Sequence, residues 1–139
     1  MSTAFLHQNR RVGLGNRATM IKKETLLYAA AVAIGVVVWI AVSRATNKRE
    51  AWDSEAYFSV GMPIVCFAAF VLGMIEPRRS WRWGVAPLVG QLAAMLVTQG
   101  IGNLLPLGVI VFAVLSLPSV LAARLGAFVR DRWLRRNAT

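Results

Sequence analysis

Residues 25–43 read TLLYAAAVAIGVVVWIAVS and contain no charged side chain. A helix of this length is about 28 Å long at ~1.5 Å per residue, and the hydrocarbon core of a bilayer is ~30 Å thick. A helix on the core of a soluble protein would instead place polar residues every three or four positions. This stretch therefore predicts a membrane-spanning helix.

Three further apolar stretches follow, at about 56–75, 83–102 and 104–123, with short charged or Gly- and Pro-containing segments between them. Hydrophobic residues make up 57% of the 139 positions, which exceeds the ~45–50% typical of soluble proteins. We expect an all-α membrane protein, an up-down-up-down bundle of four transmembrane helices with no soluble domain. A basic N-terminal arm (1–23) precedes the transmembrane domain (24–127), and a basic tail (128–139) follows it.

Basic residues near the spans are unevenly distributed between the two predicted sides. Thirteen lie in the arm, in the turn after the second span and in the tail, against three in the loop after the first span. Because cytoplasmic segments carry the excess of Lys and Arg, both termini are predicted to be cytoplasmic. The 13 Arg against 3 Lys, in a chain rich in Ala, Val and Gly, favour a bacterial source and hence the cell inner membrane.

The net charge of +10 could indicate nucleic-acid binding in a soluble chain. No nucleic-acid-binding motif accompanies it, and basic residues flanking spans are attracted to anionic lipid headgroups. We therefore expect the bilayer, and not nucleic acid, to be the partner of these charges. The predicted headgroup contacts are Arg78, Arg79, Arg82, Arg124 and Arg130.

The third span is the most polar of the four. At 100° per residue, Gln91 and Thr98 fall on one helix face, and Gln99 lies about 80° from Gln91. An amide facing hydrocarbon without a partner is costly, so these side chains must face protein or water. Two interpretations stay open, namely hydrogen bonds between helices or a polar path for a substrate or ion.

Small residues recur every four positions in the spans. This spacing lets helix backbones approach closely in a membrane, and it predicts packing between helices. The positions are Ala69, Gly73, Ala86, Gly90 and Ala94, with similar pairs at Ala31/Gly35 and Ala122/Gly126. Pro63 and Pro118 lie inside the second and fourth spans, where proline favours kinks.

Nothing in the sequence indicates catalysis. The spans carry no ionisable residue at mid-depth, where such residues usually mark function. His7 is the only histidine and Cys66 the only cysteine, which excludes a multi-histidine metal site and an intrachain disulfide. Cys66 is expected to be a small buried hydrophobe, and we expect no enzyme activity, no cofactor and no metal.

Two functions fit these features. The first is an accessory or scaffold subunit that binds a membrane protein partner, or a second copy of itself, by helix packing and that contacts anionic lipid. The second is an oligomeric transporter or channel with a polar path along the third span, lined by Gln91, Thr98 and Gln99. A lysis-associated role is a third and weaker hypothesis, based on size and the basic tail alone.

Overall fold

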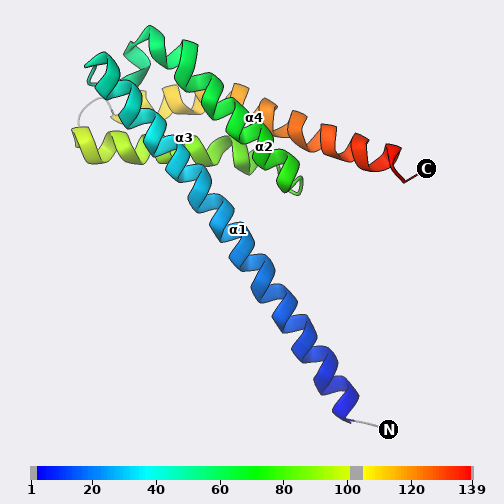
Figure 1. Ribbon diagram of the computed structural model, residues 1–139. Coiled ribbons are helices and arrows are strands. Elements are labelled where there is room, and N and C mark those ends of the chain that lie inside the picture. The colour runs from blue at the N-terminus through cyan, green and yellow to red at the C-terminus, as the bar shows by residue number, and fades with distance from the viewer. Residues whose placement is uncertain (1–2, 101–104, 139) are drawn as a thin grey trace.

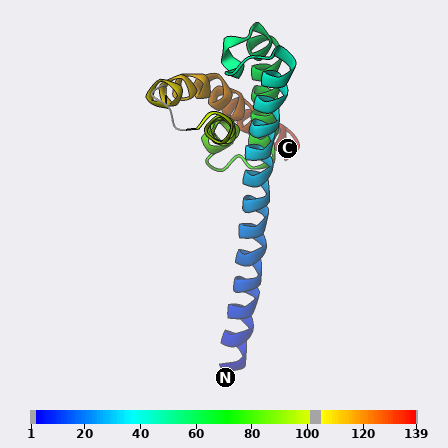
Figure 2. The same cartoon turned by 90° about the vertical axis from the view of Figure 1, so that its left-hand side faces the viewer.

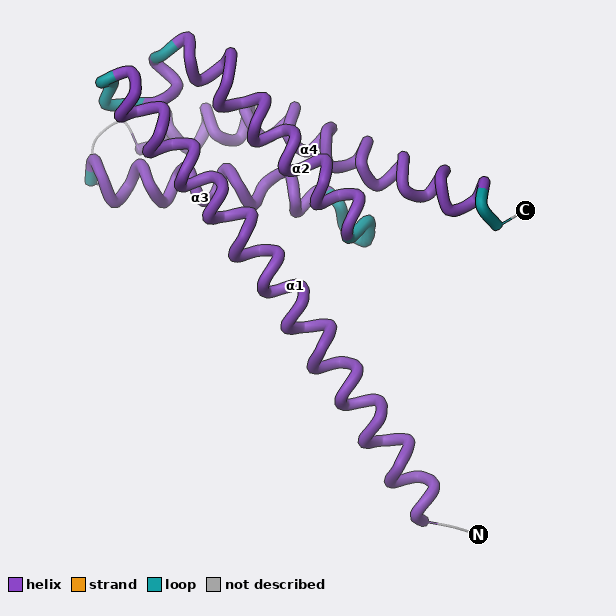
Figure 3. Tube along the Cα trace, viewed as in Figure 1, coloured by secondary structure: helices purple, strands orange, loops and turns teal. Residues whose placement is uncertain are grey.

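The computed structural model describes residues 3–100 and 105–138, with side chains placed from 19 to 100 and from 106 to 138. Within these ranges every regular element is helical and no strand occurs, so the all-helical prediction is confirmed (Figures 1 and 3). The elements are α1 (Thr3–Thr46), the short 3₁₀ helix η1 (Ala51–Asp53), the π-helical segment η2 (Tyr57–Gly61), α2 (Met62–Ile75), α3 (Trp81–Gln99) and α4 (Leu105–Arg136).

Three segments are long and apolar enough to cross a membrane. They are Thr19–Thr46 in α1, Tyr57–Ile75 in η2 and α2, and Pro106–Arg136 in α4. The predicted third span also forms a helix, α3, but Arg82, Gln91, Thr98 and Gln99 make it less apolar than the others. A helix needs a fully apolar surface only where lipid surrounds it, and α3 packs against all three of the other helices.

Helices α1 and α4 extend well beyond the predicted spans. The first begins at Thr3, inside the predicted arm, and the last continues to Arg136, inside the predicted tail. Charged residues mark where a helix leaves hydrocarbon, but they do not stop it, because Lys, Arg and Glu are good helix formers. In Figures 1 and 2 the N-terminal half of α1 extends away from the other helices, and residues 19–26 of this helix are all exposed.

The predicted turn between the third and fourth spans falls largely on residues 101–104, which lie outside the described residues. On its near side, Gly100 ends α3 with a φ of 75°, and its N–H donates to the Leu96 carbonyl at 2.9 Å. Glycine adopts this backbone conformation without steric cost. On the far side, Pro106 is the second residue of α4, where its missing N–H leaves no helical hydrogen bond unmade.

Glycines bring α1 and α3 into backbone contact. A Cβ added at Gly35 would lie 1.7 Å from the Pro87 carbonyl oxygen, and one at Gly90 would lie 2.1 Å from the Val32 carbonyl oxygen. Each helix therefore presents a glycine to the backbone of the other. Any side chain at either position would separate the two helices.

The same reciprocal arrangement joins α2 and α4. A Cβ at Gly73 would lie 2.1 Å from the Ala123 carbonyl oxygen, and one at Gly126 would lie 2.1 Å from the Phe70 carbonyl oxygen. In the predicted pair Ala122/Gly126, only Gly126 is buried, because Ala122 is half-buried. The small residue that is buried beside Gly126 on α4 is Ala123. All five predicted packing positions, Ala69, Gly73, Ala86, Gly90 and Ala94, are buried.

The two prolines behave differently. Pro63 is the second residue of α2 and directly follows the π-helical segment η2, where the wider helical turn replaces a simple kink. Pro118 lies inside α4, is exposed, and leaves the helix continuous over its 32 residues.

The outer surface of the bundle is apolar. Large hydrophobic side chains are exposed on every helix, for example Leu26 (71%), Phe67 (70%) and Val97 (86%). A soluble monomer rarely shows such contiguous apolar surface, so this exposure agrees with the membrane-spanning helices inferred from the sequence.

Candidate functional site

Gln91 is the most deeply buried polar side chain of α3. Its exposed fraction is 0%, and its Oε1 accepts a 2.6 Å hydrogen bond from the hydroxyl of Tyr57. Its Nε2 has no hydrogen-bond partner among the described residues. Leu88 and Met95, one turn before and after it on α3, belong to the surrounding apolar cluster.

Tyr57 is the first residue of η2, and the sequence analysis did not predict it as a site residue. Its side chain is fully buried, and its backbone N–H donates to the Ser54 carbonyl at 3.1 Å. The signal that could have found it is the rule that a buried amide needs a partner. With no ionisable group at mid-depth, a tyrosine at the start of a neighbouring span was the natural candidate.

Thr98 and Gln99 lie at the C-terminal end of α3, two turns from Gln91. The Thr98 hydroxyl bonds back to the Ala94 and Met95 carbonyls at 2.8 and 3.2 Å, and the Gln99 amide donates to the Arg49 carbonyl. Both residues line a cavity of about 270 Å³ at this end of the bundle. Trp39, Ile40, Ser43, Arg44 and Arg49 complete its walls.

The structure does not join these three residues into one polar face. Met95 lies between Gln91 and Thr98 and is 95% buried, at 5% exposure, in the apolar cluster around Gln91. Gln91 is engaged inside the bundle, whereas Thr98 is exposed and Gln99 half-buried. The predicted polar stripe thus divides into an internal hydrogen-bonded pair and a separate cavity at the helix end.

Three aromatic rings close the bundle beside that cavity. Trp39 of α1, Trp52 of η1 and Phe112 of α4 pack with ring centroids 5.0–5.7 Å apart. Trp39 is 1% exposed, so the ring is part of the core and not a free interfacial anchor. Aromatic contacts of this kind add to the apolar burial of each ring and tie three elements together.

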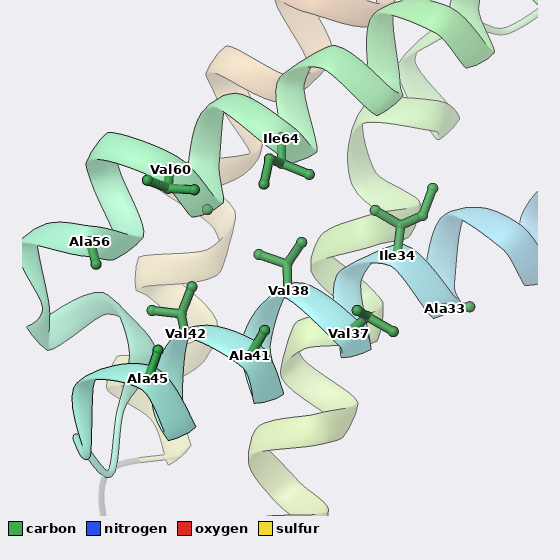
Figure 4. Close-up of a pocket in the computed structure, with 11 residues that line it drawn as sticks. Ala33, Ile34, Val37, Val38, Ala41, Val42, Ala45, Ala56, Val60 and Ile64 are labelled. Carbon is green, nitrogen blue, oxygen red and sulfur yellow. The ribbon is translucent and has the colours of Figure 1, made fainter.

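An apolar groove of about 650 Å³ separates α1 from the η2–α2 segment (Figure 4). Val38 and Val42 point from α1 toward it, and Ile64 points into it from α2. None of its eleven lining residues carries a charge or a hydroxyl group. The α1–α2 groove, as we call it below, is lined by Ala33, Ile34, Val37, Val38, Ala41, Val42, Ala45, Ala56, Val60, Gly61 and Ile64.

Three small residues lie on the α1 wall of this groove. Ala33, Ala41 and Ala45 are all exposed there, among the larger side chains of the same wall. The buried pair Ala31 and Gly35 faces α3 within the bundle. α1 therefore packs on α3 through one pair of small residues and leaves three further alanines exposed along the α1–α2 groove.

The five arginines predicted to contact headgroups occupy different environments. Arg78, Arg79 and Arg124 are exposed, and Arg82 is half-buried at the start of α3. Arg130 makes intramolecular hydrogen bonds: its Nη1 donates to the Met74 carbonyl at 2.9 Å and to the Ile75 carbonyl. It thus caps the C-terminus of α2, where a cation is favourable.

In the part of the chain that the structure describes, no group of three His, Cys, Asp or Glu side chains could hold a metal ion. Cys66 is unpaired and half-buried, less enclosed than the sequence suggested. The candidate sites are therefore the buried Tyr57–Gln91 pair, the end cavity and the α1–α2 groove. Comparison of the chain with protein-family models, with curated proteins and with solved structures gives no match.

Proposed function

We propose that this chain is an integral membrane protein without catalytic activity, an accessory subunit that binds one transmembrane helix of a partner protein in the α1–α2 groove. The observation that carries the proposal is that groove: about 650 Å³, wholly apolar, and lined on α1 by exposed Ala33, Ala41 and Ala45. Helix association in lipid depends on close backbone approach at small residues. The bundle uses the same device internally at Gly35 and Gly90.

The dimensions of the groove suit a helix. From Ala33 to Ala45 it follows thirteen residues of α1, which span roughly 18 Å at 1.5 Å per residue. That length corresponds to more than three helical turns, along which an incoming helix would meet Ala33, Ala41 and Ala45, with Val37 between the first two. Because the side chains that line the groove are apolar, they need no hydrogen-bond partner from the incoming helix.

We further propose that the helices cross the membrane in alternating directions, up-down-up-down. In this arrangement α3 is a membrane span in addition to the three apolar segments, and both termini are cytoplasmic. Contacts at the two ends of the bundle support the alternating direction of the helices, and the uneven distribution of Lys and Arg supports the orientation. At one end Lys23 Nζ lies 4.0 Å from a Glu76 carboxylate oxygen, and Arg130 bonds to Met74. At the other, Gln99 bonds to the Arg49 carbonyl, and a Cβ at Gly108 would lie 3.5 Å from the Trp52 ring.

Photo-crosslinking in native membranes tests the partner site. A photoreactive phenylalanine analogue at Ala41, inside the groove, should give one protein adduct of defined mass, and that protein should copurify stoichiometrically with the unmodified chain. Ala41→Trp should abolish copurification by filling the groove. Leu121→Trp is the matched control, because Leu121 is 61% exposed on α4 and away from the groove.

Two results would count against the partner site. One is a lipid-only adduct at Ala41, and the other is a copurifying protein that Ala41→Trp does not release. A crosslink between two copies of the chain would show that the groove binds a second copy of this chain, in a homo-oligomer, and not another protein.

The transport function has one observation in its favour. The cavity lined by Thr98 and Gln99 also holds Ser43, whose buried Oγ has no partner among the described residues. Thr98→Val, which removes a hydroxyl group from this cavity, separates the two functions. Flux lost with assembly intact favours transport, whereas intact partner binding with no flux in the wild type favours the accessory subunit.

A further inference from the structure

A second groove lies between α1 and α3, near the start of α3. Its volume is about 270 Å³. Tyr28, Trp81 and Arg82 form its rim, and Val32, Val85 and Val89 form its apolar walls. We call it the α1–α3 groove.

The rim of this groove is held in place by the fold. The Trp83 ring lies 4.7 Å from the Tyr28 ring, which joins α3 to α1 at this level. Trp83 Nε1 also donates to the Glu76 carbonyl at 2.8 Å, which holds the turn between α2 and α3 against the helix. Trp81 remains 49% exposed beside them, as an indole at a membrane interface would be.

The charge at the rim is strongly positive. Arg78 and Arg79 precede Arg82 in the same turn, and the backbone N–H of Arg82 donates to the Arg79 carbonyl at 3.1 Å. Glu76, the one carboxylate of the turn, already faces Lys23 at 4.0 Å. The three guanidinium groups make no hydrogen bond or ion pair with the side chains that the structure places, and the N-terminus of α3 adds its positive dipole end.

The dimensions of the groove select a narrow occupant. From Trp81 to Val89 it follows nine residues of α3, which span about 12 Å and lie within one ~15 Å leaflet. Spread over that length, its volume corresponds to a mean cross-section of roughly 22 Å², against roughly 36 Å² for the α1–α2 groove over 18 Å. The α1–α3 groove is therefore the narrower and shorter of the two, with dimensions that suit a single hydrocarbon chain.

We propose that the α1–α3 groove binds one anionic phospholipid, with an acyl chain against Val32, Val85 and Val89 and the phosphate at Arg82 and Arg79. Basic pockets between transmembrane helices on the cytoplasmic side are where anionic headgroups bind. The inference rests on the membrane location proposed above. It goes beyond general headgroup contact because it assigns one groove and one class of lipid.

Tryptophan quenching by brominated lipid tests the proposal, because Trp81 lines the groove. The full chain is reconstituted in phosphatidylcholine vesicles in which brominated phosphatidylglycerol, or brominated phosphatidylcholine in a parallel series, replaces a rising fraction of the lipid. The Trp81 signal is the difference between the wild type and Trp81→Phe. We expect phosphatidylglycerol to quench it preferentially, at about fivefold lower mole fraction per engaged arginine.

Variants separate headgroup recognition from acyl-chain fit. Arg82→Gln should lower the preference for phosphatidylglycerol about fivefold, whereas Arg135→Gln, which removes the same charge from the far end of α4, should leave it unchanged. Val85→Phe should fill the groove and reduce Trp81 quenching by both lipids. Circular dichroism of each variant checks that the helices are intact.

Three results would overturn the inference. Equal quenching by the two lipids, or a preference that Arg82→Gln leaves unchanged, would overturn the lipid site while leaving the membrane location standing. Shielding of Trp81 from both lipids together with a dimer would show that a second copy covers the groove. No quenching of any of the five tryptophans would refute the membrane location and the inference with it.

Discussion

The hydrogen bond between Tyr57 and Gln91 is the main polar contact inside the bundle. It joins η2 to α3 across a sequence separation of 34 residues, and both side chains are fully buried. An unpaired buried amide costs more than a hydrogen bond returns, so the pair is best understood as a constraint on how these two elements align. The Nε2 of Gln91, which carries two N–H donors, has no partner among the described residues.

Tyr57→Phe should destabilise the protein by about 0.5–2 kcal/mol, because it leaves Oε1 of Gln91 without its donor inside the bundle. Unfolding in mixed micelles with increasing sodium dodecyl sulfate measures the change. Tyr28→Phe is the control, since Tyr28 contributes a ring contact to Trp83 that phenylalanine retains.

A double-mutant cycle extends this prediction. Gln91→Leu removes the amide itself, so Tyr57→Phe should cost little more in that background. Additive losses from the two substitutions would show that the hydrogen bond does not form in the membrane.

Among the elements, two helix pairs depend on glycine. Gly73→Val should destabilise the α2–α4 contact by about 1–3 kcal/mol, because its Cβ alone would lie 2.1 Å from a backbone oxygen that cannot move aside. Gly108→Ala is the matched control. Its Cβ would meet the flexible end of Met95 at 3.1 Å, so it should cost much less.

Thermal aggregation in detergent reports both glycine variants. If Gly73→Val and Gly108→Ala had equal midpoints, the close contact between α2 and α4 would be contradicted.

The end of α2 depends on a residue 55 positions away. Arg130→Gln should destabilise this end by about 0.5–1.5 kcal/mol, because the guanidinium bonds to the Met74 and Ile75 carbonyls. Arg132→Gln, on an exposed part of α4, should have little effect. Faster hydrogen exchange at residues 72–76 in the first variant alone is the expected result, and equal exchange in both would argue against the cap.

Element ends were the part of the helices that sequence reasoning placed least well. Arg44 and the charges after it lie at the end of α1, which stops at Thr46. At the other end of α1 and in α4, the predicted spans end at charged residues, but the helices continue to Thr3 and Arg136. Hydropathy reports what surrounds a helix, while backbone propensity decides how long it is.

For the molecule as a whole, we predict that residue 78 faces the cytoplasm and residue 53 the opposite side. Single cysteines replace Arg78 or Asp53, both exposed, in a Cys66→Ala background that removes the native thiol. A membrane-impermeant maleimide added to intact cells should label position 53 and reach position 78 only after permeabilisation. Labelling of both positions from outside, or the reverse pattern, would reject this topology.

The candidate sites were only partly predictable. The sequence named Gln91, Thr98 and Gln99 as one group because helical periodicity places them on related faces. It could not show that Met95 lies buried between them. Nor could it find the two grooves, because each is formed by residues from different helices.

By itself the sequence determined that the chain is helical, where its long apolar helices lie, and that small residues mediate their contacts. These properties follow from composition and spacing within each segment, which are local. Only the tertiary structure decided which helix packs on which, that α3 lies among the other three, and that Arg130 caps α2. Those outcomes depend on side chains distant in sequence meeting in space, and periodicity along one helix carries no information about the partner it faces.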